Sequence, residues 1–227
     1  MTQFSEYFSR NQGALTLEQQ EALQQGRVAV VGCGGLGGFV IEALVRIGVG
    51  RLQLFDPDVF APSNCNRQLN ALSQTLGRNK AEVAAARAEA IHPFCAVTPV
   101  PLDFRADSVV DWDQIEVVVD CLDSTQARHD LAALCTRLHR PLVHGAVNGW
   151  CGQVGVQLPG GDLFSRLYPE RLANQPQEAP SVLSFTVATV ASLQAGEAVK
   201  LLLGMPSSLH NHWLHIDLKH GDFLFMD

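Results

Sequence analysis

The sequence is poor in charged residues and has no basic run. Charged residues make up 17% of the 227 residues, and 23 acidic against 16 basic residues give a formal net charge of −7. An acidic chain without a basic run attracts nucleic-acid phosphates weakly, so a nucleic-acid partner is not expected. Hydrophobic residues make up 47%, which is ample for a buried core and excludes general disorder.

Closely spaced cysteines are also missing. The chain has six cysteines, but no two of them form a CxxC pair. Structural zinc sites of the knuckle type need such pairs, so no zinc is expected. Cysteines scattered through apolar segments are typical of buried, reduced thiols in a cytoplasmic protein.

No leader peptide and no membrane span are expected from the sequence. Its first ten residues, MTQFSEYFSR, contain no apolar core of the kind that a secretory signal needs. The longest uncharged stretch, residues 179–196, contains proline, glutamine, serines and threonines. We therefore expect a buried helix there, no membrane partner and a cytoplasmic location.

Apolar runs alternate with helical patterns through the first two thirds of the chain. A continuous apolar run such as RVAVVG is typical of a strand buried on both faces, and this alternation predicts parallel strands. The expected strands cover residues 27–32, 51–56, 115–120 and 141–147. The expected helices cover residues 16–25, 38–48, 78–92 and 124–139.

The last third follows a different pattern. We expect a strand at 150–158, a long substrate-side loop at 159–180, a helix at 184–204 and a terminal hairpin at 213–226. The prediction is an α/β fold with a Rossmann-like, doubly wound, mostly parallel sheet and an antiparallel C-terminal portion. Residues 1–227 are expected to form one domain, with residues 1–25 as an N-terminal helical arm.

A glycine cluster, GCGGLG, lies between the first predicted strand and the next helix. Glycines let the backbone approach phosphates closely, and the helix N-terminus offers free N–H groups. Asp56 ends the second predicted strand, where an acid can accept both hydroxyls of a ribose. Together these features predict an adenine-nucleotide site.

Polar residues after Asp56 favour ATP over NAD as the nucleotide. Asn64, Arg67 and Gln68 follow within one loop, and Lys80 opens the next helix. Nucleotidyl transfer needs fixed cations for the charge that builds up on the phosphates. A dehydrogenase has little use for this cluster beside its hydride pocket.

The segment DCLDS follows the third apolar run. Carboxylates at the carboxyl ends of parallel strands face the ligand crevice. Asp123 is placed to hold Mg²⁺ on a triphosphate, and Asp120 is expected to brace the loop. An alternative is that Asp123 only caps the following helix.

With these motifs the chain resembles the ThiF/MoeB/HesA family, the bacterial relatives of ubiquitin-activating enzymes. The resemblance spans most of residues 7–225, through the segments GCGGLG, LFDPDVFAPSNCNRQ, GRNKAE, DCLDS, HGAVNGWCGQV and SLQAGEAVKLLLG. It implies a homodimer that uses ATP and Mg²⁺ to adenylate the C-terminal Gly-Gly carboxylate of a ubiquitin-like sulfur carrier protein.

The resemblance also implies roles for individual residues. Gly34, Gly35 and Gly37 would cradle the nucleotide, and Asp56 would hold the ribose. Asn64, Arg67 and Lys80 would grip the phosphates, Gln68 would support them, and Asp123 would bind Mg²⁺. Arg10 would reach into the site of the partner subunit.

The sequence departs from the family at three places. The CxxC zinc pairs are absent, with residues 164–167 where the first would be expected, and so is the reactive cysteine before the late helix. The third is Cys65, inside NCNRQ, which we interpret as a small loop residue and not as a nucleophile. Trp150 and Cys151 are expected beside the substrate tail, with Gly145 and Gly149 giving its backbone room, and His144 is expected in the core.

Three rival functions remain open from the sequence. The first is a dehydratase that activates the threonylcarbamoyl carboxylate of transfer RNA adenosine, and a basic patch around the cleft would favour it. The second is an NAD-dependent dehydrogenase. The third is a binding module that captures a ubiquitin-like partner without turnover.

Overall fold

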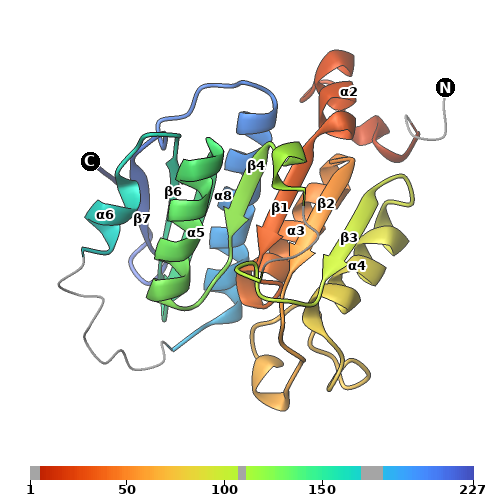
Figure 1. The fold of residues 1–227 in the computed structure, drawn as a ribbon, viewed down its shortest axis with the longest axis horizontal. Coiled ribbons are helices and arrows are strands. Elements are labelled where there is room, and N and C mark those ends of the chain that lie inside the picture. Colours follow the sequence, from red (N-terminus) through yellow and green to blue (C-terminus); the bar gives the residue numbers. More distant parts are fainter. Residues whose placement is uncertain (1–5, 107–110, 170–180) are drawn as a thin grey trace.

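The computed structural model describes residues 6–106, 111–169 and 181–227 (Figure 1). All eight described strands join one sheet in the order β3-β2-β1-β4-β5-β6-β7-β8. The first five strands are parallel to their neighbours, and the last three join antiparallel. The strands are β1 Arg27–Val31, β2 Arg51–Phe55, β3 Ala96–Val100, β4 Val117–Asp120, β5 Leu142–Asn148, β6 Cys151–Gln157, β7 Trp213–Asp217 and β8 Asp222–Met226. The predicted fold class is confirmed.

Helices cover both faces of this sheet. The α-helices are α2 Leu17–Gln25, α3 Gly35–Ile47, α4 Lys80–Ile91, α5 Thr125–Leu138, α6 Leu163–Leu167 and α8 Ser184–Leu202, with short 3-10 turns η1 Ser9–Asn11, η2 Pro62–Asn64 and η3 Trp112–Gln114. In Figure 1, α5 and α6 lie in front of the sheet, while α3, α4 and α8 lie behind it.

Strand β1 shows why the sheet has two cores. Val28 and Val30 pack with α3, α4 and α8, whereas Ala29 and Val31 pack with α5. Because side chains alternate along a strand, a strand buried on both faces is apolar at every position. This explains the continuous apolar run RVAVV, and it places α8 and α5 on opposite faces of β4 and β5.

Two elements were not expected from the sequence. Strand β3 lies at one edge of the sheet, is only partly buried and contains Pro99, so its sequence carries a weak strand signal. Helix α6 falls inside the expected loop at 159–180 and is only five residues long. The remainder of that expected loop, residues 170–180, lies outside the described residues.

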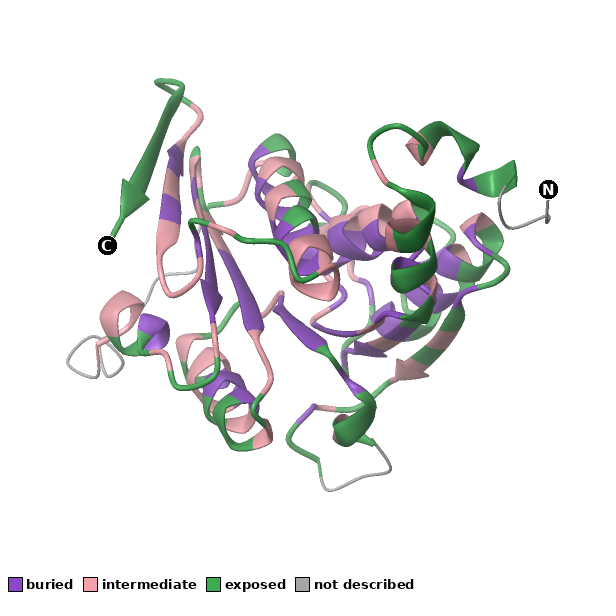
Figure 2. Ribbon diagram, turned by 90° about the horizontal axis from the view of Figure 1, so that it is seen from above, coloured by how far each residue is buried: buried purple, intermediate pink, exposed green. Residues whose placement is uncertain are grey.

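The other edge of the sheet is formed by β8, which is exposed along its whole length (Figure 2). Four successive apolar side chains lie there in the open. They are Phe223, Leu224, Phe225 and Met226. The late helix α8 is buried against α3 and the sheet, and within the described ranges no helix has both the length and the apolarity needed to cross a bilayer.

We predict that glycine-to-alanine substitutions at Gly152, in β6 beneath α8, and at Gly196, within α8, change the free energy of unfolding in opposite directions. A Cβ on Gly152 of β6 would lie 2.3 Å from Cγ2 of Val190, so Gly152→Ala should cost about 1–3 kcal/mol of unfolding free energy. A Cβ on Gly196 would meet nothing within 4 Å, so Gly196→Ala should add about 0.5–1 kcal/mol through helix propensity. Urea denaturation measures both, and equal shifts of the same sign would contradict the packing of α8 on β6.

Candidate functional site

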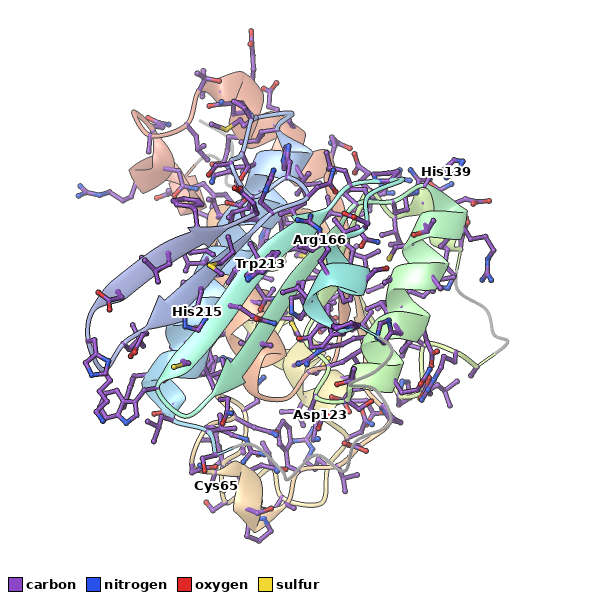
Figure 3. The ribbon with its side chains drawn as sticks, turned by 90° about the vertical axis from the view of Figure 1, so that its left-hand side faces the viewer. Cys65, Asp123, His139, Arg166, Trp213 and His215 are labelled. Atoms are coloured by element: carbon purple, nitrogen blue, oxygen red, sulfur yellow. The ribbon has the colours of Figure 1, made fainter. Side chains whose placement is uncertain are left out.

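A cleft of about 980 Å³ lies at the carboxyl ends of β1, β2 and β4. It brings together seven of the predicted site residues: Gly34, Gly35, Asp56, Arg67, Gln68, Lys80 and Asp123. Of the other predicted residues, Gly37, Asn64 and Arg10 are not in its lining. Asp123 and Cys65 lie at the same end of the molecule (Figure 3), but Cys65 is exposed outside the cleft lining.

The glycine turn between β1 and α3 is packed too tightly for side chains. Gly32 has a φ of +95°, and a Cβ there would lie 2.6 Å from the carbonyl oxygen of Cys121. A Cβ on Gly37 would lie 1.8 Å from the carbonyl oxygen of Gly32. Gly37 thus lets α3 close onto its own turn, while Gly34 and Gly35 face the cleft at the helix N-terminus. Free N–H groups at such a terminus favour an anion.

Asp56 holds this turn from the end of β2. One carboxylate oxygen accepts the N–H of Cys33 at 2.7 Å, and the other accepts the N–H of Asp58 at 2.9 Å. Burial raises the pKa of Asp56, and the Cys33 hydrogen bond and the nearby Lys80 charge lower it in part. Each oxygen keeps a further lone pair, so Asp56 can accept ribose hydroxyls without releasing the turn.

Lys80 is a nearly buried cation at the start of α4. Its Nζ is 2.9 Å from Oδ2 of Asp58, with the lysine side chain 10% exposed and the aspartate side chain 67% exposed. Asn79 caps α4 and donates to the carbonyl oxygens of Asp56 and Asp58, which fixes the helix start beside the end of β2. A phosphate could replace the exposed Asp58 carboxylate as the partner of Lys80.

Asn64 and Arg67 have different positions in the next loop. Asn64 accepts the N–H of Ala61 at 2.9 Å, so its side chain closes η2. Arg67 donates to Ser63 O and to Asn66 Oδ1, and it lines the cleft together with the buried Gln68. The loop therefore presents one cation to the cleft and uses Asn64 to hold its shape.

Asp123 does not cap α5. The N-cap is Ser124, whose Oγ accepts the N–H of Ala127 at 3.1 Å, so the alternative reading of Asp123 is wrong. Asp123 is exposed and lines the cleft. In the part of the chain that the structure describes, no three His, Cys, Asp or Glu side chains gather as a metal site. Mg²⁺ needs no such group, because one or two carboxylates and phosphate oxygens suffice, so Asp123 fits it.

Asp120 braces the loop, as expected. Its side chain is fully buried, with Oδ1 accepting the N–H of Leu122 at 2.9 Å and Oδ2 facing Nδ1 of His144 at 2.7 Å. His144 is also fully buried, in agreement with the expected core position. Its Nε2 is 3.0 Å from the hydroxyl of Tyr168, and Gln153 approaches both groups.

Three residues of the cleft wall, Arg128, Gln153 and Tyr168, were missed from the sequence. Arg128 lies one helical turn after Ser124, so a search for cations near the start of α5 would have found it. Nothing local marks Gln153 or Tyr168, because strand register and the end of α6 bring them to His144.

Of the residues expected beside the substrate tail, only some lie at the cleft. Cys151 lines the cleft, but Trp150 lies outside its lining and packs on the exposed Phe185 with ring centroids 4.9 Å apart. A Cβ on Gly145 would lie 2.3 Å from Cδ of Gln194, so that glycine makes room for α8. Gly149 has a φ of +57° in the turn between β5 and β6.

Arg10 is far from the cleft of its own chain. Its neighbour Asn11 donates to Ile47 O at the end of α3, whereas the start of α3 faces the cleft. A helix of 13 residues is about 20 Å long. Figure 1 shows α2, which follows Arg10 in the chain, at the opposite ends of the strands from the carboxyl ends of β1, β2 and β4.

His144 predicts a pH dependence of stability. Burial lowers its pKa below the ordinary 6.5, against the raising effect of Asp120. Below pH 6.5 the unfolded chain binds a proton there that the native chain does not. The contribution of neutral His144 to the free energy of unfolding is therefore fully present above pH 6.5, and it decreases as the pH falls from 6.5 towards the lowered pKa of the folded protein.

The test compares the wild type with His144→Gln by urea denaturation between about pH 7 and pH 5. The variant should be less stable at neutral pH but should lose less unfolding free energy on acidification, by up to about 1.4 kcal/mol per pH unit. The pKa of the buried His92 is also lowered, so the difference between the two slopes isolates His144. Identical slopes would contradict this assignment.

Comparison with known proteins shows one family. The model of the ThiF family matches residues 8–227. The SAMP-activating enzyme E1 of Haloferax volcanii is 37% identical over 208 residues, covering 88% of this chain and 76% of that protein. The sulfur carrier protein adenylyltransferase of Thermus thermophilus is 34% identical over 218 residues, covering 91% and 80%.

A solved structure agrees with this assignment. The E. coli tRNA N6-threonylcarbamoyladenosine dehydratase, TcdA, superposes with a TM-score of 0.74 at 26% identity and covers 88% of this chain and 95% of that chain. The residues matched to the ThiF family, 8–227, include the glycine turn, the loop with Arg67 and the Asp123 turn. The chain belongs to the ThiF family.

Proposed function

We propose that the protein is an ATP-dependent adenylyltransferase that acts on the C-terminal glycine carboxylate of a small ubiquitin-like sulfur carrier protein. A carboxylate oxygen attacks the α-phosphorus of ATP, the bond to the β-phosphate oxygen breaks, and pyrophosphate leaves. The observation that carries this proposal is the joint presence of Asp56, Lys80, Arg67 and Asp123 in the lining of one cleft. Relatives named as sulfur-carrier-activating enzymes support the partner class.

Each group has a distinct part in the proposed reaction. Asp56 holds the ribose and the glycine turn, while Arg67 and Lys80 offset the charge of the phosphates. Asp123 would hold Mg²⁺, which supplies charge neutralisation on the triphosphate when bound. No side chain has to act as a general base, because a carboxylate is already ionised at neutral pH.

The dehydratase of transfer RNA is the second candidate, because the similar TcdA structure bears that name. Such an enzyme would use the same cleft to activate a carboxylate. The net charge of −7 disfavours a polynucleotide, and the rim arginine Arg105 is neutralised by Asp103 and Asp130. An NAD-dependent reaction has no support from these relatives. We infer a carrier of the kind used in thiamine or molybdenum cofactor synthesis, and a cytoplasmic location; relatives named molybdopterin-synthase adenylyltransferase support the second pathway.

The first test is pyrophosphate exchange into ATP in the presence of a carrier protein ending in Gly-Gly. Asp123→Ala should lower the exchange rate at least about 100-fold, a loss of about 2.7 kcal/mol in transition-state stabilisation. The melting temperature should hardly change, because Asp123 neither caps α5 nor is buried. Asp113→Ala also removes an exposed carboxylate, outside the cleft lining, and should exchange normally.

Near-normal exchange in folded Asp123→Ala would remove Asp123 from the metal site. Exchange driven by threonylcarbamoylated transfer RNA, with none from any carrier protein, would replace the first proposed function with the second.

A trans role for Arg10 is the remaining part of the proposal. We infer a homodimer in which Arg10 of each subunit serves the cleft of the other, since Arg10 is remote from its own cleft. Mixing Arg10→Ala chains with Asp123→Ala chains should then restore activity, because one site in each mixed dimer carries neither lesion. With random exchange, about a quarter of wild-type activity is expected.

The control for this mixture is confirmed subunit exchange by mass spectrometry of labelled chains. Activity equal to the sum of the two parents, despite exchange, would show that Arg10 does not act across an interface. A monomer in light scattering at micromolar concentration would reject the arrangement.

A further inference from the structure

Adenylation brings two anions together, and the cleft has cations on two sides. Arg67 and Lys80 lie on the side of the glycine turn, in the segments that follow β2. Arg128 lies on the other side, near the start of α5. A carboxylate that approaches a triphosphate is repelled by it, so it gains from a cation separate from those that hold the phosphates.

Arg128 is held rigidly but keeps free donors. Its Nη2 donates to Leu122 O at 2.6 Å, and its Nη1 donates to the Tyr168 hydroxyl at 3.2 Å. The guanidinium lies over the Tyr168 ring, 5.4 Å from its centroid. Its Nε is buried and faces Asp120, so the donors left for a planar, two-oxygen ligand are the second hydrogens of Nη1 and Nη2. By contrast, Arg105 donates from all three of its nitrogens to Asp103 and Asp130.

The direction of the hydrogen bonds between Tyr168, His144 and Asp120 is set by the Asp120 carboxylate, which can only accept. Arg128 and Gln153 approach the Tyr168 oxygen as donors, so the hydroxyl hydrogen is free to donate to Nε2 of His144, 3.0 Å away. His144 then carries its own hydrogen on Nδ1 and donates it to Asp120 at 2.7 Å. Each member thereby fixes the next, from the buried Asp120 outward to Arg128.

Asp120 also offsets the charge of the arginine. Its Oδ2 lies 3.7 Å from Nε of Arg128, whose side chain is 11% exposed. A nearly buried guanidinium without such a partner would be costly. The carboxylate is fully buried behind the wall, so it compensates Arg128 without blocking the face that borders the cleft.

We propose that Arg128 receives the carboxylate of the substrate, and that Tyr168 and His144 are positioning residues that hold it there. The proposal rests on the proposed adenylation. In this proposal Arg67 and Lys80 bind the phosphates on one side of the cleft, and Arg128 binds the carboxylate on the other side.

The first test separates the two substrates. Arg128→Gln should lower kcat/KM for the carrier protein about 100-fold in pyrophosphate exchange, mainly through KM, while calorimetric ATP affinity stays within about twofold. Tyr168→Phe removes one hydroxyl and should lower kcat/KM about tenfold in the same way. Tyr7→Phe is the matched control, because Tyr7 is the other of the two tyrosines and is 51% exposed. An equal loss of ATP affinity, or an unchanged kcat/KM in Arg128→Gln, would overturn the proposal.

The second test does not depend on turnover or on finding the carrier. Wild-type protein should bind 5′-O-(N-glycylsulfamoyl)adenosine, a stable glycyl-adenylate analogue, more tightly than AMP, and Arg128→Gln should lose about tenfold of that preference without weakening AMP binding. An unchanged preference in the variant would overturn the role of Arg128. Failure of exchange with every carrier, with this preference intact, would reject only the carrier as substrate.

The positioning role has its own signature. Nitrogen-15 NMR of the imidazole, assigned with His144→Gln, should show His144 neutral with its hydrogen on Nδ1 at pH 7. Tyr168→Phe should keep that tautomer and shift the Nε2 resonance, because Nε2 loses a donor. A hydrogen on Nε2 in the wild type would overturn the chain of hydrogen bonds that reaches Arg128.

Discussion

The buried carboxylate of Asp120 is the group around which this end of the molecule is arranged. A carboxylate with no exposure is tolerated only where donors and a nearby cation replace water. Leu122, His144 and Arg128 meet that need from a loop, the neighbouring strand and a helix. Because those partners come from three elements, satisfying one side chain fixes the positions of β4, β5 and α5 at the cleft.

The glycine turn imposes a second constraint on the same region. Gly32 and Gly37 bring β1, α3 and the loop after β4 closer than any side chain would permit. The N-terminus of α3 therefore lies beside the Asp123 turn, and the nucleotide and the metal would share one narrow space. Asp56 ties the turn to β2, so the acid proposed to hold the ribose also has a structural part.

The sequence predicted those parts of the site whose signals are local. Gly34, Asp56 and Asp123 come directly after strands with clear apolar runs, and parallel strands deliver their carboxyl ends to one edge. Lys80 is the first residue of α4, whose helical pattern is also local. Arg10 was placed by resemblance alone, and its neighbour Asn11 binds the end of α3, away from the cleft, so no pattern in one chain reveals a role for Arg10. The helix α6, the edge strand β3 and the Tyr168 contacts depend on packing between distant segments, which periodicity does not encode.

The open edge of β8 has a consequence for how molecules of this protein meet. A terminal strand with unpaired backbone groups and apolar side chains on both faces is a template for another strand. Such an edge allows two copies to associate through β8, which is separated by β5, β6 and β7 from β4 and by more strands from β1 and β2. Such a pair would have the mass of a dimer without delivering an arginine to any cleft. Mass in solution and completeness of the catalytic site are thus separate properties of this chain.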